Sequence, residues 1–230
     1  MRLRVDPADN PEMRALLLAC FCCLALVACS TRPASTPVVP EAVDVAPTAE
    51  VPAETSVPVE LRESFRIDTY SVSGRTVNEI RADLNRAGPL SIEEGRRFDA
   101  MTSWSLKWNL RYKRAGSGCS LQEATLLLDI VLLVPELAEP AELPVRTLAA
   151  WQVYRQALDG HEMGHVENQR QGAAALQAKL NEFEGFWESC RDLTAALKAE
   201  GDAAIQAIFA ADRAHDESTN HGRLQGAVFP

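Results

Sequence analysis

The chain has 230 residues, enough for one ordinary domain and some additional unstructured chain. Asp and Glu outnumber Lys and Arg by 32 to 23, which gives a net charge of -9, and 47 % of the residues are hydrophobic. Nucleic-acid-binding proteins need a basic face, and membrane channels need apolar runs of about 18 residues or more. The sequence has neither feature, which excludes both classes.

The first 28 residues have the pattern of a secretory signal peptide. Arginines precede an uncharged apolar run at 15–27, which is too short for a spanning helix. The run ends in Leu26-Val27-Ala28-Cys29, which resembles the lipobox of bacterial lipoproteins, and Ser30 fits the outer-membrane sorting pattern. We therefore predict a lipid on Cys29 and an envelope location, with the outer membrane as partner. An ordinary cleaved signal is the alternative, and Met13 is an alternative start.

Residues 29–59 have the composition of a linker. Six of the 13 prolines fall there among Ala, Val, Thr, Ser and Glu, without an aromatic residue. Such a segment buries too little apolar surface to fold. The folded domain is therefore expected to span residues 60–230.

The cysteine count predicts one disulfide. Three of the six cysteines lie in the signal segment and Cys29 is assigned to the lipid, which leaves Cys119 and Cys190. In an oxidising compartment such a pair is expected to form a bridge across a long loop. Two buried free thiols are the alternative.

The domain begins with strand and helix signals. Residues 64–72 are rich in β-branched and aromatic side chains, which predicts a strand. Thr76 and Glu79 form a capping box, so a helix is expected from there to Gly88-Pro89.

Two further strands and two long helices are predicted after it. Large apolar residues alternate with polar ones over 104–112, which indicates a strand buried on one side. Residues 119–134 are expected to be its antiparallel, central partner, ended by Pro135. Helices are predicted at about 144–184 and 189–213. The expected fold class is α+β, with N-terminal antiparallel strands and a short helix followed by two long helices.

The predicted first long helix contains the sequence His161-Glu162-Met163-Gly164-His165, an HExxH motif. Histidines four residues apart lie on one face of a helix, where both imidazoles can bind one Zn²⁺ ion. Glu162 lies close enough to act as general base on a water activated by the metal. Gly160 and Gly164 weaken the helix; close packing of another backbone near the metal is the expected reason, and chance is the alternative.

The other two histidines, His215 and His221, lie together after the predicted last helix. A catalytic zinc site has three protein ligands and one open position. We predict His221 as the third ligand because imidazole suits zinc and Gly222 permits close approach. Asp216 is the alternative, followed by the glutamates at 182, 184 and 188.

These features together resemble a bacterial family described as secreted zinc-dependent proteases, a domain formerly of unknown function. The resemblance covers residues 64–230. It rests on the HExGH motif and on a terminal Tyr-Asp-x-x-Thr-x-His-Gly element, of which Asp216, Thr219, His221 and Gly222 match. Further matches are Tyr70-x-Val72-x-Gly74-x-Thr76, Gly88-Pro89, Trp104-x-x-x-Trp108 and Trp151-x-x-Tyr154.

The resemblance implies a zincin-type peptidase fold with His161 and His165 as ligands and Glu162 as base. His215 stands where the family has Tyr, a residue suited to stabilise the oxyanion, and His215 is expected to take that role less efficiently. The predicted function is an envelope-anchored zinc metallopeptidase acting on peptides or proteins. A non-enzymatic, zinc-stabilised lipoprotein and a cell-wall amide hydrolase are the alternatives.

Overall fold

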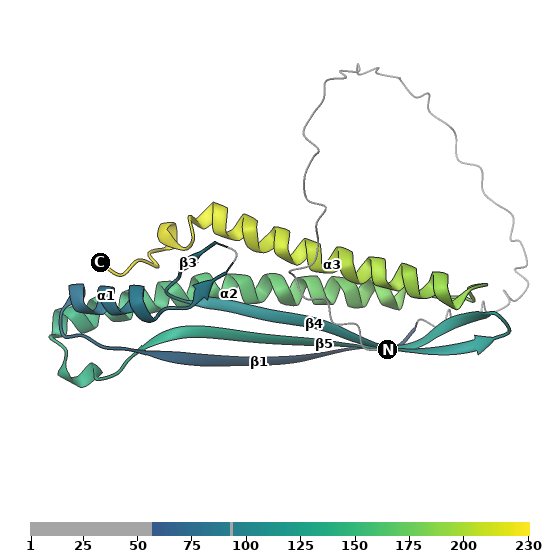
Figure 1. The fold of residues 1–230 in the computed structure, drawn as a ribbon, viewed down its shortest axis with the longest axis horizontal. Helices are drawn as coiled ribbons and strands as arrows, with labels where there is room; N and C mark the ends of the chain where they lie inside the picture. The colour runs from purple at the N-terminus through teal and green to yellow at the C-terminus, as the bar shows by residue number, and fades with distance from the viewer. Residues whose placement is uncertain (1–56, 93) are drawn as a thin grey trace, which may run out of the picture. The chain divides into compact units, whose positions relative to one another are not determined.

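The computed structural model of the chain describes residues 57–92 and 94–230. The signal segment, Cys29 and nearly all of the linker lie outside these residues. The described part contains a three-stranded sheet with two long helices on one face and a short helix near one end (Figure 1). The expected α+β class is confirmed.

Strands β4 (Met101–Ala115) and β5 (Gly118–Leu137) form an antiparallel hairpin, and β5 is the central strand of the sheet, as predicted. The alternation in β4 has the expected result. Its apolar side chains face the helices and pack in the core, whereas the polar ones between them lie on the other face. The residues of β4 in this core are Trp104, Leu106, Trp108, Leu110 and Tyr112.

Strand β1 (Val59–Val72) differs from the expectation in length and direction. It begins five residues earlier than predicted and runs parallel to β5, with Phe65 opposite Ile130. The sheet is therefore mixed, and the prediction of antiparallel strands only is wrong. A parallel pair requires a crossover connection. Here α1, two short strands and β4 intervene between β1 and β5.

The prediction that Pro135 ends β5 is wrong. The strand continues to Leu137, and Pro135 pairs with Tyr70 of β1. Proline within a strand normally removes a ladder hydrogen bond. Strand β4 pairs with β5 only as far as Leu133. On the β4 side, Pro135 therefore lies beyond the ladder, where a main-chain N–H is not needed for pairing.

Helix α1 (Val77–Ala87) forms where the capping box predicts it. The Thr76 hydroxyl accepts a hydrogen bond from the Glu79 amide, and the Glu79 carboxylate accepts one from the Thr76 amide. Two short strands, β2 (Leu90–Ser91) and β3 (Arg96–Arg97), follow and pair with each other. They were not predicted, because two-residue strands leave no periodic pattern.

The two long helices are α2 (Val145–Asn181) and α3 (Cys190–Thr219), with short 3-10 turns before and after them at Pro140–Glu142 and Arg223–Gln225. Helix α3 continues six residues beyond its predicted end, because no glycine or proline interrupts residues 202–220. His215 and Asp216 therefore lie in its last turns instead of in a loop. Within the described residues, no helix has both the length and the apolar character needed to cross a membrane.

The core consists of two apolar clusters along the sheet. One contains Leu158 together with Trp151, Tyr154 and Phe229, and the other contains Val166 together with residues of β5 and α3. The HExxH segment of α2 lies between Leu158 and Val166. The surroundings of its backbone are therefore fixed on both sides by packed side chains.

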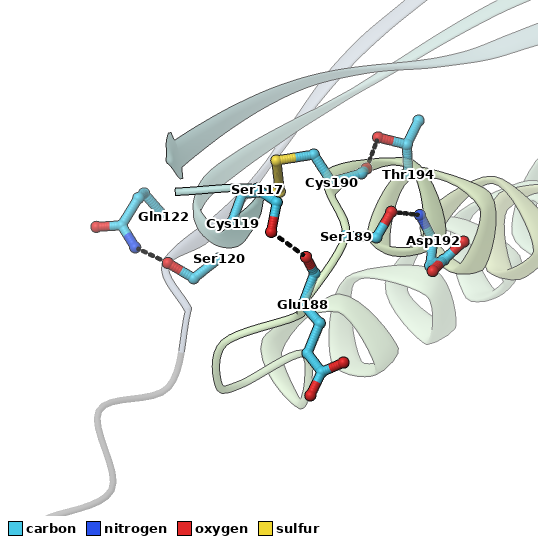
Figure 2. The surroundings of a disulfide bond; sticks show 9 residues. All are labelled: Ser117, Cys119, Ser120, Gln122, Glu188, Ser189, Cys190, Asp192 and Thr194. Atoms are coloured by element: carbon cyan, nitrogen blue, oxygen red, sulfur yellow. Dashed lines mark hydrogen bonds between the residues drawn. A yellow bond between two sulfur atoms is a disulfide. The ribbon is translucent and has the colours of Figure 1, made fainter. Parts of the chain in front are cut away.

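Cys119 and Cys190 form the disulfide that the sequence predicts, with their Cα atoms 5.1 Å apart (Figure 2). The bond links the start of β5 to the start of α3. Next to it, Cys119 and Trp187 exchange two main-chain hydrogen bonds of 2.9 Å. The bridge therefore attaches the helical hairpin to the sheet.

Replacing both cysteines by alanine should lower the free energy of unfolding by about 2–4 kcal/mol, because the bridge restricts a loop with a sequence separation of 71. Urea unfolding of the oxidised wild type and the double variant measures the difference. Wild type treated with a thiol reductant should lose a similar amount of stability, and the variant should not respond. Equal unfolding midpoints for oxidised wild type and variant would contradict the prediction.

A second connection joins β1 to α2. The Arg170 guanidinium donates hydrogen bonds of 2.7–3.1 Å to both carboxylate oxygens of Glu63. This pair holds the pKa of Glu63 below its ordinary value. The stabilising effect is therefore present above the pKa of an unfolded glutamate and is lost as the pH falls through the lower, folded value.

Glu63→Gln should destabilise the protein by about 0.5–1 kcal/mol at pH 7, and the difference should be smaller at an acidic pH below the ordinary pKa of glutamate. Urea unfolding at the two pH values measures it. Glu60→Gln in the same strand is the matched control, because the Glu60 carboxylate binds its exposed neighbour Arg62 within the strand and not a residue of α2, so no comparable stability change is expected. A loss for Glu63→Gln that is equal at both pH values would show that the ion pair is not its cause.

Candidate metal centre

Three segments meet beside the middle of α2. His161 and Glu162 are buried, with 5 % and 6 % of their surface exposed, and His165 lies one turn further along the same face. The last turns of α3 bring Asp216 to this face. Asn220 and His221 then adopt positive φ angles of 50°, which turn the chain so that His221 also reaches the site.

The Asp216 carboxylate lies at the centre of the group. Its Oδ1 atom is 3.3 Å from Nε2 of His161 and 3.3 Å from Nε2 of His165. The same oxygen is 3.5 Å from Nδ1 of His221, whose side chain is 40 % exposed. The structure thus brings together the motif histidines, the predicted third ligand and its first alternative.

The other ring nitrogen of each motif histidine has a partner of its own. Nδ1 of His161 is 3.0 Å from Oε1 of Gln225, and Nδ1 of His165 is 3.1 Å from Oδ1 of Asp212. Both partners are acceptors, so each Nδ1 carries the hydrogen. In the neutral rings, Nε2 is then an acceptor with its lone pair facing Asp216.

Acceptor atoms that face one another at 3.3 Å require a positive charge between them. Without a metal, a proton supplies it: burial favours neutral His165, but hydrogen bonds with Asp212 and Asp216 outweigh burial and raise its pKa to about 10. Burial likewise opposes ionisation of Asp216, yet its bonds with His161 and His165 hold its pKa below the ordinary value. A bound divalent cation would take the place of that proton.

These donors fit zinc in chemistry and spacing. Zinc takes imidazole nitrogen and carboxylate oxygen at about 2.0–2.2 Å with tetrahedral geometry, so two ligand atoms lie about 3.4 Å apart. The two distances of 3.3 Å agree with that spacing. The Nδ1 partners, one of them the carboxylate of Asp212, are of the kind that orients imidazoles in known metal sites.

His215 is also close, but its orientation differs. One nitrogen each from His161, His165 and His215 lie within 4.8 Å of one another. However, the His215 ring is stacked on His161, with 16° between the planes, so their in-plane lone pairs do not converge on one ion. Its Nε2 lies 3.0 Å from the main-chain oxygen of His161. Orientation therefore favours Asp216 over His215 as a third ligand.

Glu162 is held by one side-chain hydrogen bond. The Thr102 hydroxyl, at the start of β4, donates to its Oε2 atom at 2.7 Å. Burial raises the pKa of Glu162 above its ordinary value, against the effects of Thr102 and the two histidines. One carboxylate oxygen is thus fixed, and the raised pKa makes the group a stronger proton acceptor than an ordinary glutamate.

A cavity of about 310 Å³ adjoins these groups. Glu162 and three of the histidines line it, together with Asp212 and Asp216. The other residues that line it are Ser91, Glu94, Phe98, Asp99, Ala100, Met101, Thr102, Leu158 and Ala227. The volume is at the lower end of the range for ligand-binding pockets.

The sequence analysis did not identify Asp212, Gln225 or Thr102. Asp212 had a detectable signal, because it lies four residues before Asp216 and therefore on the same face of α3. Thr102 and Gln225 reach the site from β4 and from the C-terminal segment. No local pattern marks either of them.

The family comparison matches most of the described residues. Residues 67–222 match the family described as "Bacterial protein of unknown function (DUF922)", and the chain belongs to this family. That description names no activity, so the zinc protease function implied by the resemblance remains a prediction. No curated protein and no solved structure matches the chain, so the zincin-like arrangement also remains a prediction.

Asp216→Ala should lower zinc affinity more than 100-fold, because it removes the oxygen that lies between the two Nε2 atoms. Competition with a chelator of known affinity measures the effect. His221→Ala tests the ligand predicted from the sequence in the same way, and Glu217→Ala, an exposed neighbour, is the control. A larger loss for His221→Ala than for Asp216→Ala would make His221 the third ligand.

Proposed function

We propose that the protein is a zinc-dependent hydrolase that cleaves peptide bonds. The observation that carries this proposal is the convergence of His161, His165 and Asp216 beside buried Glu162, at the wall of a cavity. A structural zinc site is closed by four protein ligands, whereas a catalytic site leaves one position open. The adjoining cavity favours the second kind.

The residues divide into two roles. His161, His165 and Asp216 would hold the ion, with Gln225 and Asp212 keeping the imidazoles oriented. Zinc in such a site supplies Lewis acidity, which lowers the pKa of a water molecule to about 7 and polarises a carbonyl group.

Glu162 would move the proton. Its Oε2 atom is engaged by Thr102, so the other oxygen is the one that can accept a proton from the attacking water. The same carboxyl group can then donate that proton to the leaving amine. A role for His215 in stabilising the oxyanion remains a prediction, since its Nε2 atom is engaged by the main chain of His161.

We infer the location from the sequence. The lipobox at Cys29 and the proline-rich segment after it support a domain tethered by lipid to the outer membrane. Substrates are then envelope or extracellular proteins and peptides. The amide bonds of the cell wall would meet the same chemistry, and purified peptidoglycan is the assay that separates them from protein substrates.

Glu162→Gln should reduce the rate of peptide cleavage at least about 100-fold, the usual contribution of a general base. Zinc content should stay that of wild type, because Glu162 is not among the proposed ligands. The assay uses casein and a peptide library, with Glu167→Gln on the exposed side of α2 as control. Activity equal to wild type in Glu162→Gln would remove this residue from the mechanism.

A further inference from the structure

The His215 ring occupies the space above Gly164. A Cβ atom added to Gly164 would lie 2.4 Å from both Cε1 and Nε2 of His215, far inside contact distance. At Gly160, one turn earlier in α2, an added Cβ would meet nothing within 4 Å, so the prediction of close packing is wrong at this glycine. Of these two glycines, only Gly164 therefore provides room for a residue of the other helix.

The ring fits into a corner made by α2. It lies parallel to the His161 ring, with centroids 4.8 Å apart, and edge-on to the His165 ring at 4.9 Å. Its Nε2 donates to the His161 main-chain oxygen at 3.0 Å, and Thr219 bonds back to the His215 oxygen at 2.7 Å. His215 is thus fixed from both helices.

The residue after His215 is Asp216, whose Oδ1 atom faces both Nε2 atoms at 3.3 Å. The separation of α2 and the last turn of α3 therefore determines where this carboxylate lies. Near this point, one of the contacts between the two helices is a flat ring resting on a residue without a side chain. His215 itself does not line the cavity.

We propose that the contact between Gly164 and His215 is a spacer that sets the position of Asp216 relative to His161 and His165. His215 is then a positioning residue for the metal centre. This inference rests on the proposed function, since it concerns the same candidate ligands. It assigns a purpose to Gly164, which helix propensity alone would disfavour.

The test compares two single-methyl additions in the full chain, Gly164→Ala and Gly160→Ala. Gly164→Ala should lower zinc affinity at least tenfold, measured by chelator competition. It should also change the visible absorption of the cobalt-substituted protein, because the added methyl pushes His215 and Asp216 away. Gly160→Ala should leave both unchanged, and both metal-free variants should keep wild-type helix content by circular dichroism.

Two further variants separate spacing from general disruption. In the double variant Gly164→Ala/His215→Ala, removing the ring makes room for the methyl group, so the two losses of affinity should not add. His215→Phe keeps a flat ring without the hydrogen bond and should retain more affinity than His215→Ala. The spacer proposal would be overturned if the losses of zinc affinity in the two single variants added up in the double variant. It would also be overturned if His215→Phe and His215→Ala lost the same affinity.

The outcomes distinguish the two proposals. If wild type binds no zinc, the proposed function fails and the spacer with it. If wild type binds zinc and Gly164→Ala binds it equally well, the proposed function stands and only the spacer is overturned. A tenfold or larger loss of zinc affinity in Gly164→Ala, with no loss in Gly160→Ala, supports both.

Discussion

Two imidazole nitrogens and one carboxylate oxygen face the same small volume, and each is an acceptor there. This follows from the hydrogens on Nδ1 of His161 and His165, which are committed to Gln225 and Asp212. Electrostatics then requires a cation between them. Hydrogen bonds with Asp212 and Asp216 raise the pKa of His165, so a proton can supply this charge, and the proposed zinc ion would take the place of that proton.

The rest of the fold holds these groups in place. Packed clusters on either side fix the HExxH segment within α2, and the sheet supports its buried face. The disulfide closes the far end of the helical hairpin, where α3 begins. Asp216 lies near the other end of this 30-residue helix, far along the chain from the disulfide. Its carboxylate is held facing α2 by packing between the helices.

Local signals predicted the elements well, and their failures have physical reasons. The capping box at Thr76 and the alternation in β4 depend on neighbouring residues only, so both are confirmed. The end of α3 was placed too early because a polar segment reads as a loop, whereas Asp212 and Asp216 are turned toward α2. The parallel partner of β1 was missed because strand direction depends on the connections between strands.

Local patterns in the chain were enough to predict the class of fold, the disulfide pair and a helix that places His161 and His165 on one face, with Glu162 three residues before His165. The groups that complete the site depend on tertiary contacts. Asp216 lies between the imidazoles, His215 stacks beside them, and Thr102 holds Glu162, because α3 and β4 approach α2 at that point. These contacts depend on the packing of segments that lie far apart in the chain, and a local sequence pattern does not predict that packing.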